Sequence, residues 1–183
     1  MIKAFKQFCH CENGTQSIEA LFAFPLLALA IGATITFWDG FNTNTETQRA
    51  TYTVADMLSR EKQAIDDSYL NAMQELFAFV VDEPTGSALR VTVVTLFKDP
   101  DTEQEELRLV WSEGVGGPTG HNDISAIASR VPVMAPGDQL IFVEGYQDWT
   151  PAFNIGLDPM RFAETAITRP RFAPNLVWDS GTT

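Results

Sequence analysis

The chain has 183 residues, a formal net charge of −12 and 45% hydrophobic residues. The length leaves room for one modest domain beside a membrane segment, and the apolar fraction suffices for a packed core. Phosphate binding depends on clustered Lys and Arg, and the sequence has no basic run. The composition therefore argues against a nucleic-acid partner, while the acidic balance itself identifies no partner.

Both cysteines lie near the start of the chain, where Cys9 and Cys11 flank His10. The group offers too few ligands for a closed structural zinc site, and a Cys-x-Cys pair is poor geometry for a disulfide. The other histidine, His121, lies far away in a Gly/Pro-rich loop. We therefore expect a polar leader on the reducing side of a membrane and no cofactor, with a small metal or redox site as the alternative.

A single apolar stretch, ALFAFPLLALAIGATITFW, runs from Ala20 to Trp38 without a charge. As a helix it would span about 28 Å, close to the roughly 30 Å hydrocarbon core of a bilayer. We predict a transmembrane helix. The alternative is a buried helix of a soluble protein, but nothing else in the chain is apolar enough to surround it.

The end of this stretch argues against a removable secretory signal, whose apolar region is shorter and ends at small residues. Here Trp38 is followed directly by Asp39, which is typical of an aromatic side chain at the membrane interface. Lys3 and Lys6 precede the stretch and Arg49 follows it. The positive-inside rule then places the N-terminus in the cytoplasm and the acidic bulk of the chain outside it.

The junction before the stretch holds a glycine and a lone acid. Gly14 ends a short hydrophilic leader, and Glu19 directly precedes the apolar stretch. A carboxylate costs about 2.5–3.5 kcal/mol at the centre of a membrane helix, so it calls for a partner. If the chain is cut after Gly14, the new ammonium of Thr15 lies one turn from Glu19, or beside the Glu19 of a packed neighbour. Alternatively, Glu19 snorkels at the interface beside an uncut leader.

The segment FCHCENGTQSIEALFAFPLLALAIG resembles the TadE-like segment of Tad (Flp) pilus proteins. That family shows a Gly, then a Glu five residues on, then a Pro within the apolar helix, matched here by Gly14, Glu19 and Pro25. The family often has an acidic pair before the Gly, whereas this chain keeps one acid, Glu12. The downstream stretches DMLSRE and TRPRFAP also resemble longer TadE/TadG-like chains.

The resemblance implies a TadE/TadG-like minor pseudopilin of a Tad (Flp) type IVb pilus system, cut by a prepilin peptidase between Gly14 and Thr15. It implies a non-enzymatic protein. The implied partners are other pilin-like subunits, Tad secretion-platform proteins and membrane lipids, with no nucleic acid and no small-molecule substrate. The implied location is the inner membrane, single-pass, with the C-terminal domain periplasmic or carried into surface pili. Many type IV pilins begin with Phe or Met rather than Thr, and major Flp pilins are much shorter.

We predict an α+β fold, in which a long N-terminal transmembrane and stalk helix precedes a small antiparallel-sheet domain with short helices. The expected segments are a leader (1–14), a TadE-like transmembrane segment (15–41), a stalk helix continuation (42–65) and an extracytoplasmic domain (66–183). Pro25 is expected to kink the membrane helix, because it removes one backbone hydrogen bond.

Periodicity and turn signals predict the remaining elements. Helical spacing in the stalk relates Tyr52, Ala55, Leu58 and Ile65. A second helix starts at Asp66-Asp67-Ser68 and carries an apolar stripe of Tyr69, Met73, Leu76, Phe77 and Val80. A hairpin joins a strand at 89–97 to a strand at 107–111, and a Gly/Pro loop follows at 114–120. Asn122 or Asp123 then caps a short helix. Two further strands are expected at 139–146 and 162–168, and the tail at 170–183 is expected to be an extended strap over the domain.

The sequence offers no convincing catalytic group. A Ser-His-Asp arrangement would need His121, Asp123 and a distant serine, and no G-x-S-x-G elbow is present. The glycines at 114–117 lack the Lys-Ser/Thr of a phosphate loop. The acids at 99–106 do not keep EF-hand spacing and favour a solvated hairpin tip. We therefore expect a pseudopilin, with an uncleaved membrane-anchored periplasmic scaffold or binding module as the alternative; an anchored hydrolase fits the residues poorly.

Overall fold

The computed structural model describes residues 13–83 and 85–181, so the Cys9-His10-Cys11 group lies outside the described residues. The chain divides into two compact units. The helix–loop unit combines the described part of Met1–Gly40 with Pro151–Asp158, and the sheet unit combines Phe41–Thr150 with Pro159–Thr183.

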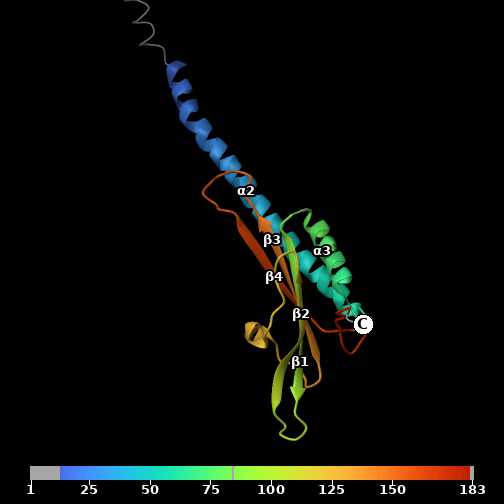
Figure 1. Ribbon diagram of the computed structural model, residues 1–183. Helices are drawn as coiled ribbons and strands as arrows, with labels where there is room; N and C mark the ends of the chain where they lie inside the picture. Colours follow the sequence, from blue (N-terminus) through green and yellow to red (C-terminus); the bar gives the residue numbers. More distant parts are fainter. Residues whose placement is uncertain (1–12, 84, 182–183) are drawn as a thin grey trace, which may run out of the picture. The chain divides into compact units, whose positions relative to one another are not determined.

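The predicted long N-terminal helix is present as α2, which runs from Asn13–Arg60 (Figure 1). The helix continues from the apolar stretch into the segment predicted as a stalk. It ends at Arg60, and Ile65 instead pairs with the C-terminal tail: Ile65 N donates to Val177 O at 2.9 Å, and Ile65 O accepts from Asp179 N at 2.8 Å. Pro25 lies inside α2, and the kink expected there stays a prediction.

The second helix, α3, spans Asp67–Val81 and begins at the predicted signal. The side chain of Asp66 accepts a hydrogen bond from Tyr69 N at 2.8 Å, which caps the first turn. The predicted stripe is confirmed at its centre, where Met73 and Phe77 are buried. Its flanks Tyr69, Leu76 and Val80 are partly buried, while Leu70 and Val81 complete the buried face.

Four antiparallel strands form one sheet in the order β2-β1-β3-β4 (Figure 1). Their bounds are β1 Ser87–Lys98, β2 Glu105–Val115, β3 Gln139–Trp149 and β4 Met160–Thr168. The predicted α+β class, the hairpin and the two later strands are therefore confirmed. The third strand is longer than predicted, because it continues to Trp149.

One face of the sheet packs against α3 and the C-terminal part of α2. β3 approaches both helices closely at Gly145, since a Cβ there would lie 2.3 Å from Thr51 Oγ1 and 2.5 Å from Phe77. The buried residues of α2 in the sheet unit are Thr43, Thr47, Ala50, Thr51, Val54, Ala55, Leu58 and Ser59. Of the residues related by helical spacing in this segment, Ala55 and Leu58 lie on the buried face, whereas Tyr52 is 55% exposed. The other buried positions are partly threonines, which a count of apolar residues passes over.

The opposite face of the sheet carries a second, smaller apolar cluster, made of Val94, Ile127, Met134, Leu140 and Phe142. The segment over it was predicted to hold a capped short helix. It holds two one-turn 3-10 helices instead, η1 Ile124–Ala126 and η2 Ala128–Arg130. Asp123 occupies the cap position of η1 but makes no side-chain capping bond. The residue before Pro132 disfavours helical backbone, which limits any helix here to short pieces.

Candidate functional site

Helix α2 carries the predicted processing junction at its N-terminal end. Gly14 and Thr15 lie in its first turn, and Glu19 follows about one turn after Thr15 along the helix. Glu19 is exposed, and no ion pair among the described residues includes it. The geometry thus leaves this carboxylate open to a partner.

The apolar part of α2 presents its side chains outward. Every residue from Ile18 to Ile31 is exposed, Pro25 included, and the apolar stretch closes with Trp38, whose exposed fraction is 74%. Among the described residues, α2 is the one helix that is long and apolar enough to cross a membrane. Core helices of soluble proteins and signal sequences can have the same length and composition. Only 6% of the most apolar window of α2 is buried, which differs from a helix in a soluble core.

The threonines of this stretch satisfy their hydroxyl groups within the helix. Thr34 Oγ1 donates to Ala30 O at 2.8 Å, and Thr36 Oγ1 donates to Gly32 O at 3.0 Å. Lipid offers no hydrogen-bond partners, so polar groups in a membrane need internal ones. These bonds make the stretch compatible with an apolar surrounding despite its polar residues.

A charged cluster lies in the sheet unit, on the sheet face that does not pack on the helices. Its centre is Glu144 of β3, whose side chain is only 7% exposed. Arg130 Nη2 donates to Glu144 Oε1 at 2.5 Å, and Arg90 Nη1 donates to Glu144 Oε2 at 3.1 Å. Burial raises the pKa of Glu144, but the hydrogen bond and charge of Arg130 and the charge of Arg90 outweigh it, so the pKa lies below its usual value.

His121, the histidine considered for a catalytic triad, belongs to this cluster. Its Nε2 lies 2.9 Å from Arg90 Nη1 and 3.3 Å from Glu144 Oε2. Ser112 Oγ accepts from the backbone N of His121 at 2.8 Å, and Arg90 Nε donates to Thr119 O at 2.9 Å. The cluster therefore fastens the Gly/Pro loop to the sheet, and the nearby serine bonds to the backbone rather than to the imidazole.

The sequence did not lead us to the Glu144 cluster, because its members are far apart along the chain. One signal was present: Glu144 is the single charge inside the apolar run QLIFVEGY. Among the described residues, no group of three or more His, Cys, Asp or Glu could hold a metal ion. The acids after β1 form an exposed turn, where Asp99 Oδ1 accepts from Asp101 N at 2.9 Å.

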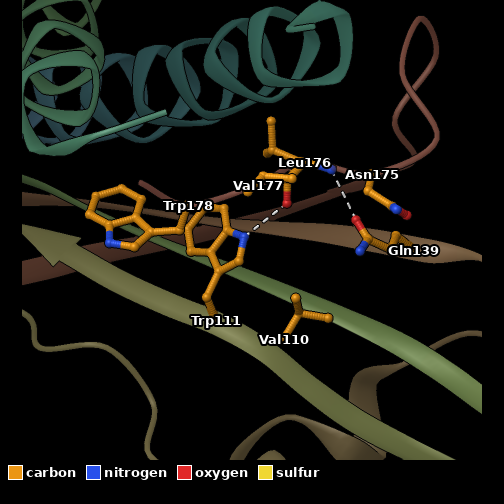
Figure 2. A pocket seen from close by; sticks show the side chains of 7 residues that line it. All are labelled: Val110, Trp111, Gln139, Asn175, Leu176, Val177 and Trp178. Carbon is orange, nitrogen blue, oxygen red and sulfur yellow. Dashed lines mark hydrogen bonds between the residues drawn. The ribbon is translucent and has the colours of Figure 1, made fainter. Parts of the chain in front are cut away.

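The C-terminal tail crosses the helix-facing side of the sheet as the predicted strap (Figure 2). Trp111 Nε1 donates to Leu176 O, and Leu176 N donates to Gln139 Oε1, each at 3.0 Å. The rings of Trp111 and Trp178 lie 5.3 Å apart. These residues line a crevice of about 440 Å³. Because these bonds already join its polar groups to one another, the crevice offers few groups to orient a ligand.

Comparison with known proteins assigns the chain to no family: no protein-family model matches it, and neither a curated protein nor a solved structure does.

Proposed function

We propose that this chain is a pilin-like membrane protein, a minor pseudopilin or assembly component of a Tad (Flp) pilus, with its acidic domain outside the cytoplasm. The observation that carries the proposal is α2 itself. Its first part is apolar and exposed, and its later part is a core element of an antiparallel-sheet unit. Pilin-like proteins likewise continue a membrane helix outward into the folded part.

The exposed apolar surface of α2 needs an apolar environment. Lipid supplies this apolar environment before assembly, while the protein is in the membrane, and the helices of neighbouring subunits supply it in an assembly. The folded part need not change between the two states, because the members of its core cluster all belong to the sheet unit. One helix thus serves both as an anchor and as a packing surface.

Glu19 has a defined part in this proposal. Cleavage between Gly14 and Thr15 creates an ammonium at Thr15, which pairs with the carboxylate of Glu19 of the same chain or of a neighbour. In a low dielectric such a pair is strongly attractive, and an unpaired carboxylate is costly. The pair therefore favours one register between adjacent helices.

The test replaces Glu19 by Gln and compares it with Glu75→Gln, which removes an exposed acid from α3. Piliation is measured by electron microscopy and by blotting for the chain in sheared filaments and in membranes. We expect Glu19→Gln to keep normal amounts of protein but to reduce piliation, and Glu75→Gln to behave as the unaltered protein.

Normal piliation in Glu19→Gln would contradict the role given to this residue. A chain that is present in membranes but never in sheared filaments would instead support the uncleaved scaffold.

A further inference from the structure

The loop between β3 and β4 belongs to the helix–loop unit rather than to the sheet unit. It covers Pro151–Asp158 and lies against α2 at Gly32: a Cβ on Gly32 would lie 3.8 Å from Cγ of Phe153. Gly32 is inside the apolar stretch that ends at Trp38. The loop therefore reaches the part of α2 that has the composition of a membrane span.

The loop is unusually apolar for a surface connection, since such segments are mostly polar. Its sequence is PAFNIGLD, with one charge at its last position. Phe153 is 49% exposed, while Ile155 and Leu157 are half-buried. An apolar tip beside an apolar helix gives the two a continuous apolar surface.

The depth of this contact follows from the helix geometry. The six residues from Gly32 to Trp38 correspond to about 9 Å along the helix axis. If Trp38 lies in the headgroup zone, which is about 5–7 Å thick, Phe153 lies about 9 Å closer to the bilayer centre and therefore between about 2 and 9 Å inside the boundary between headgroups and acyl chains. Apolar side chains of interfacial segments insert to about 5–10 Å.

The backbone of the loop limits how deeply it can go. Irregular backbone exposed to the hydrocarbon region would leave polar groups without partners. One such group is satisfied locally, because Gly156 N donates to Asn154 Oδ1 at 3.4 Å, in a turn where Gly156 has φ of +89°. The interfacial zone, which still contains water, suits a segment of this kind.

We infer that the Pro151–Asp158 loop is a second membrane contact, seated in the outer interfacial zone beside α2 with Phe153 as its anchor. The inference rests on the proposed function, in that α2 must span the bilayer. The inference adds that two segments distant in the sequence, α2 and this loop, both contact the membrane.

The test uses the full chain with Cys9→Ser and Cys11→Ser, reconstituted in phosphatidylethanolamine/phosphatidylglycerol vesicles. A fluorophore is attached at Ala152→Cys beside the anchor, at Leu29→Cys in mid-helix, or at Thr102→Cys in the exposed acidic turn. Lipids carry a nitroxide quencher either near the headgroup or near the acyl-chain end. Keeping Phe153 in place leaves the anchor intact.

We expect the Ala152 probe to be quenched at least about twofold more strongly than the Thr102 probe by the shallow nitroxide, as an interfacial segment would be. The Leu29 probe should respond most to the deep nitroxide. Quenching at Leu29 with none at Ala152 would overturn the loop contact and leave the membrane span standing. No quenching at Leu29 would contradict both the membrane span and the loop contact. Shielding of Ala152 from lipid nitroxide and from aqueous iodide alike would indicate a loop covered by protein, which also overturns the inference.

Discussion

The two parts of α2 share one continuous helix and have opposite surroundings. From Ile18 to Ile31 the helix is rich in Phe and Leu, and all of these side chains are exposed. From Thr43 to Leu58 it is more polar, and one face is buried against the sheet. The comparison shows that composition decides which surroundings a helix needs, while periodicity decides which of its faces packs. Under the proposed function, lipid or other helices surround the first part.

The largest expected effect contrasts a leucine from each part. Leu58→Ala removes a fully buried side chain from the core and should lower the free energy of unfolding by about 2–5 kcal/mol. Leu29→Ala removes a side chain that is 66% exposed and should change it by less than about 0.5 kcal/mol. Urea unfolding of the detergent-solubilised protein, followed by tryptophan fluorescence, measures both. Equal losses would contradict the division of α2 into two parts.

A second pair contrasts two glycines. Gly145→Ala places a Cβ within 2.5 Å of Thr51 and Phe77, and such overpacking should cost about 1–3 kcal/mol. Gly32→Ala meets only ordinary contact with Phe153 at 3.8 Å, and alanine is the better helix former, so no loss is expected. The same urea titration compares them. A Gly145→Ala protein as stable as the parent would show that β3 does not approach the helices this closely.

Glu144 contrasts with Glu19, because Glu144 forms ion pairs with Arg90 and Arg130 of the same chain. Its pKa is lowered from the usual 4.5, so its ionised form stabilises the fold above that value, and this stabilisation is lost as the pH falls through the lowered pKa. Glu144→Gln should cost about 1–2 kcal/mol near neutral pH.

Urea unfolding at a series of pH values measures this dependence. The difference between Glu144→Gln and the parent should shrink below pH 4.5. A difference that stays constant into the acid range would mean that the charge of Glu144 does not stabilise the fold.

The smallest effect concerns how helices begin. α3 starts anew at Asp66, whose carboxylate accepts from Tyr69 N, whereas the buried part of α2 is continued from the helix before it. Asp66→Ala should therefore cost about 1 kcal/mol, and Asp66→Asn, which can still cap, much less. Thermal unfolding of the two variants checks the difference. Equal melting temperatures would argue against the cap.

Local signals in the sequence were enough for most of the fold. The alternation in β1 and β2, the turn at Asp99-Pro100 and the cap at Asp66 each act over a few residues, and the structure has all of them. The apolar stretch likewise predicted the exposed helix from Ile18 to Ile31, although Thr36 within the same stretch is buried. The strap was foreseen from its prolines, although its bonds to Trp111 and Gln139 were not.

What escaped prediction depends on contacts between distant residues. Thr47 and Thr51 are buried because their hydroxyl groups donate to carbonyls one turn earlier, at 2.7 Å each, which lets polar side chains enter a core. Glu144 is buried because Arg90 and Arg130 reach it from other segments. Neither the partner nor the burial can be derived from residues adjacent in the sequence. The roles of Gly14, Thr15 and Glu19 stay predictions, since they concern a chemical step and an assembly.

N-terminal sequencing of the membrane-extracted protein, produced with and without its prepilin peptidase, tests the central claim most directly. The account predicts that the protein begins at Thr15 when the peptidase is present and at Met1 when it is absent. An intact Met1 under both conditions would contradict it, and the chain would then be a signal-anchored envelope protein.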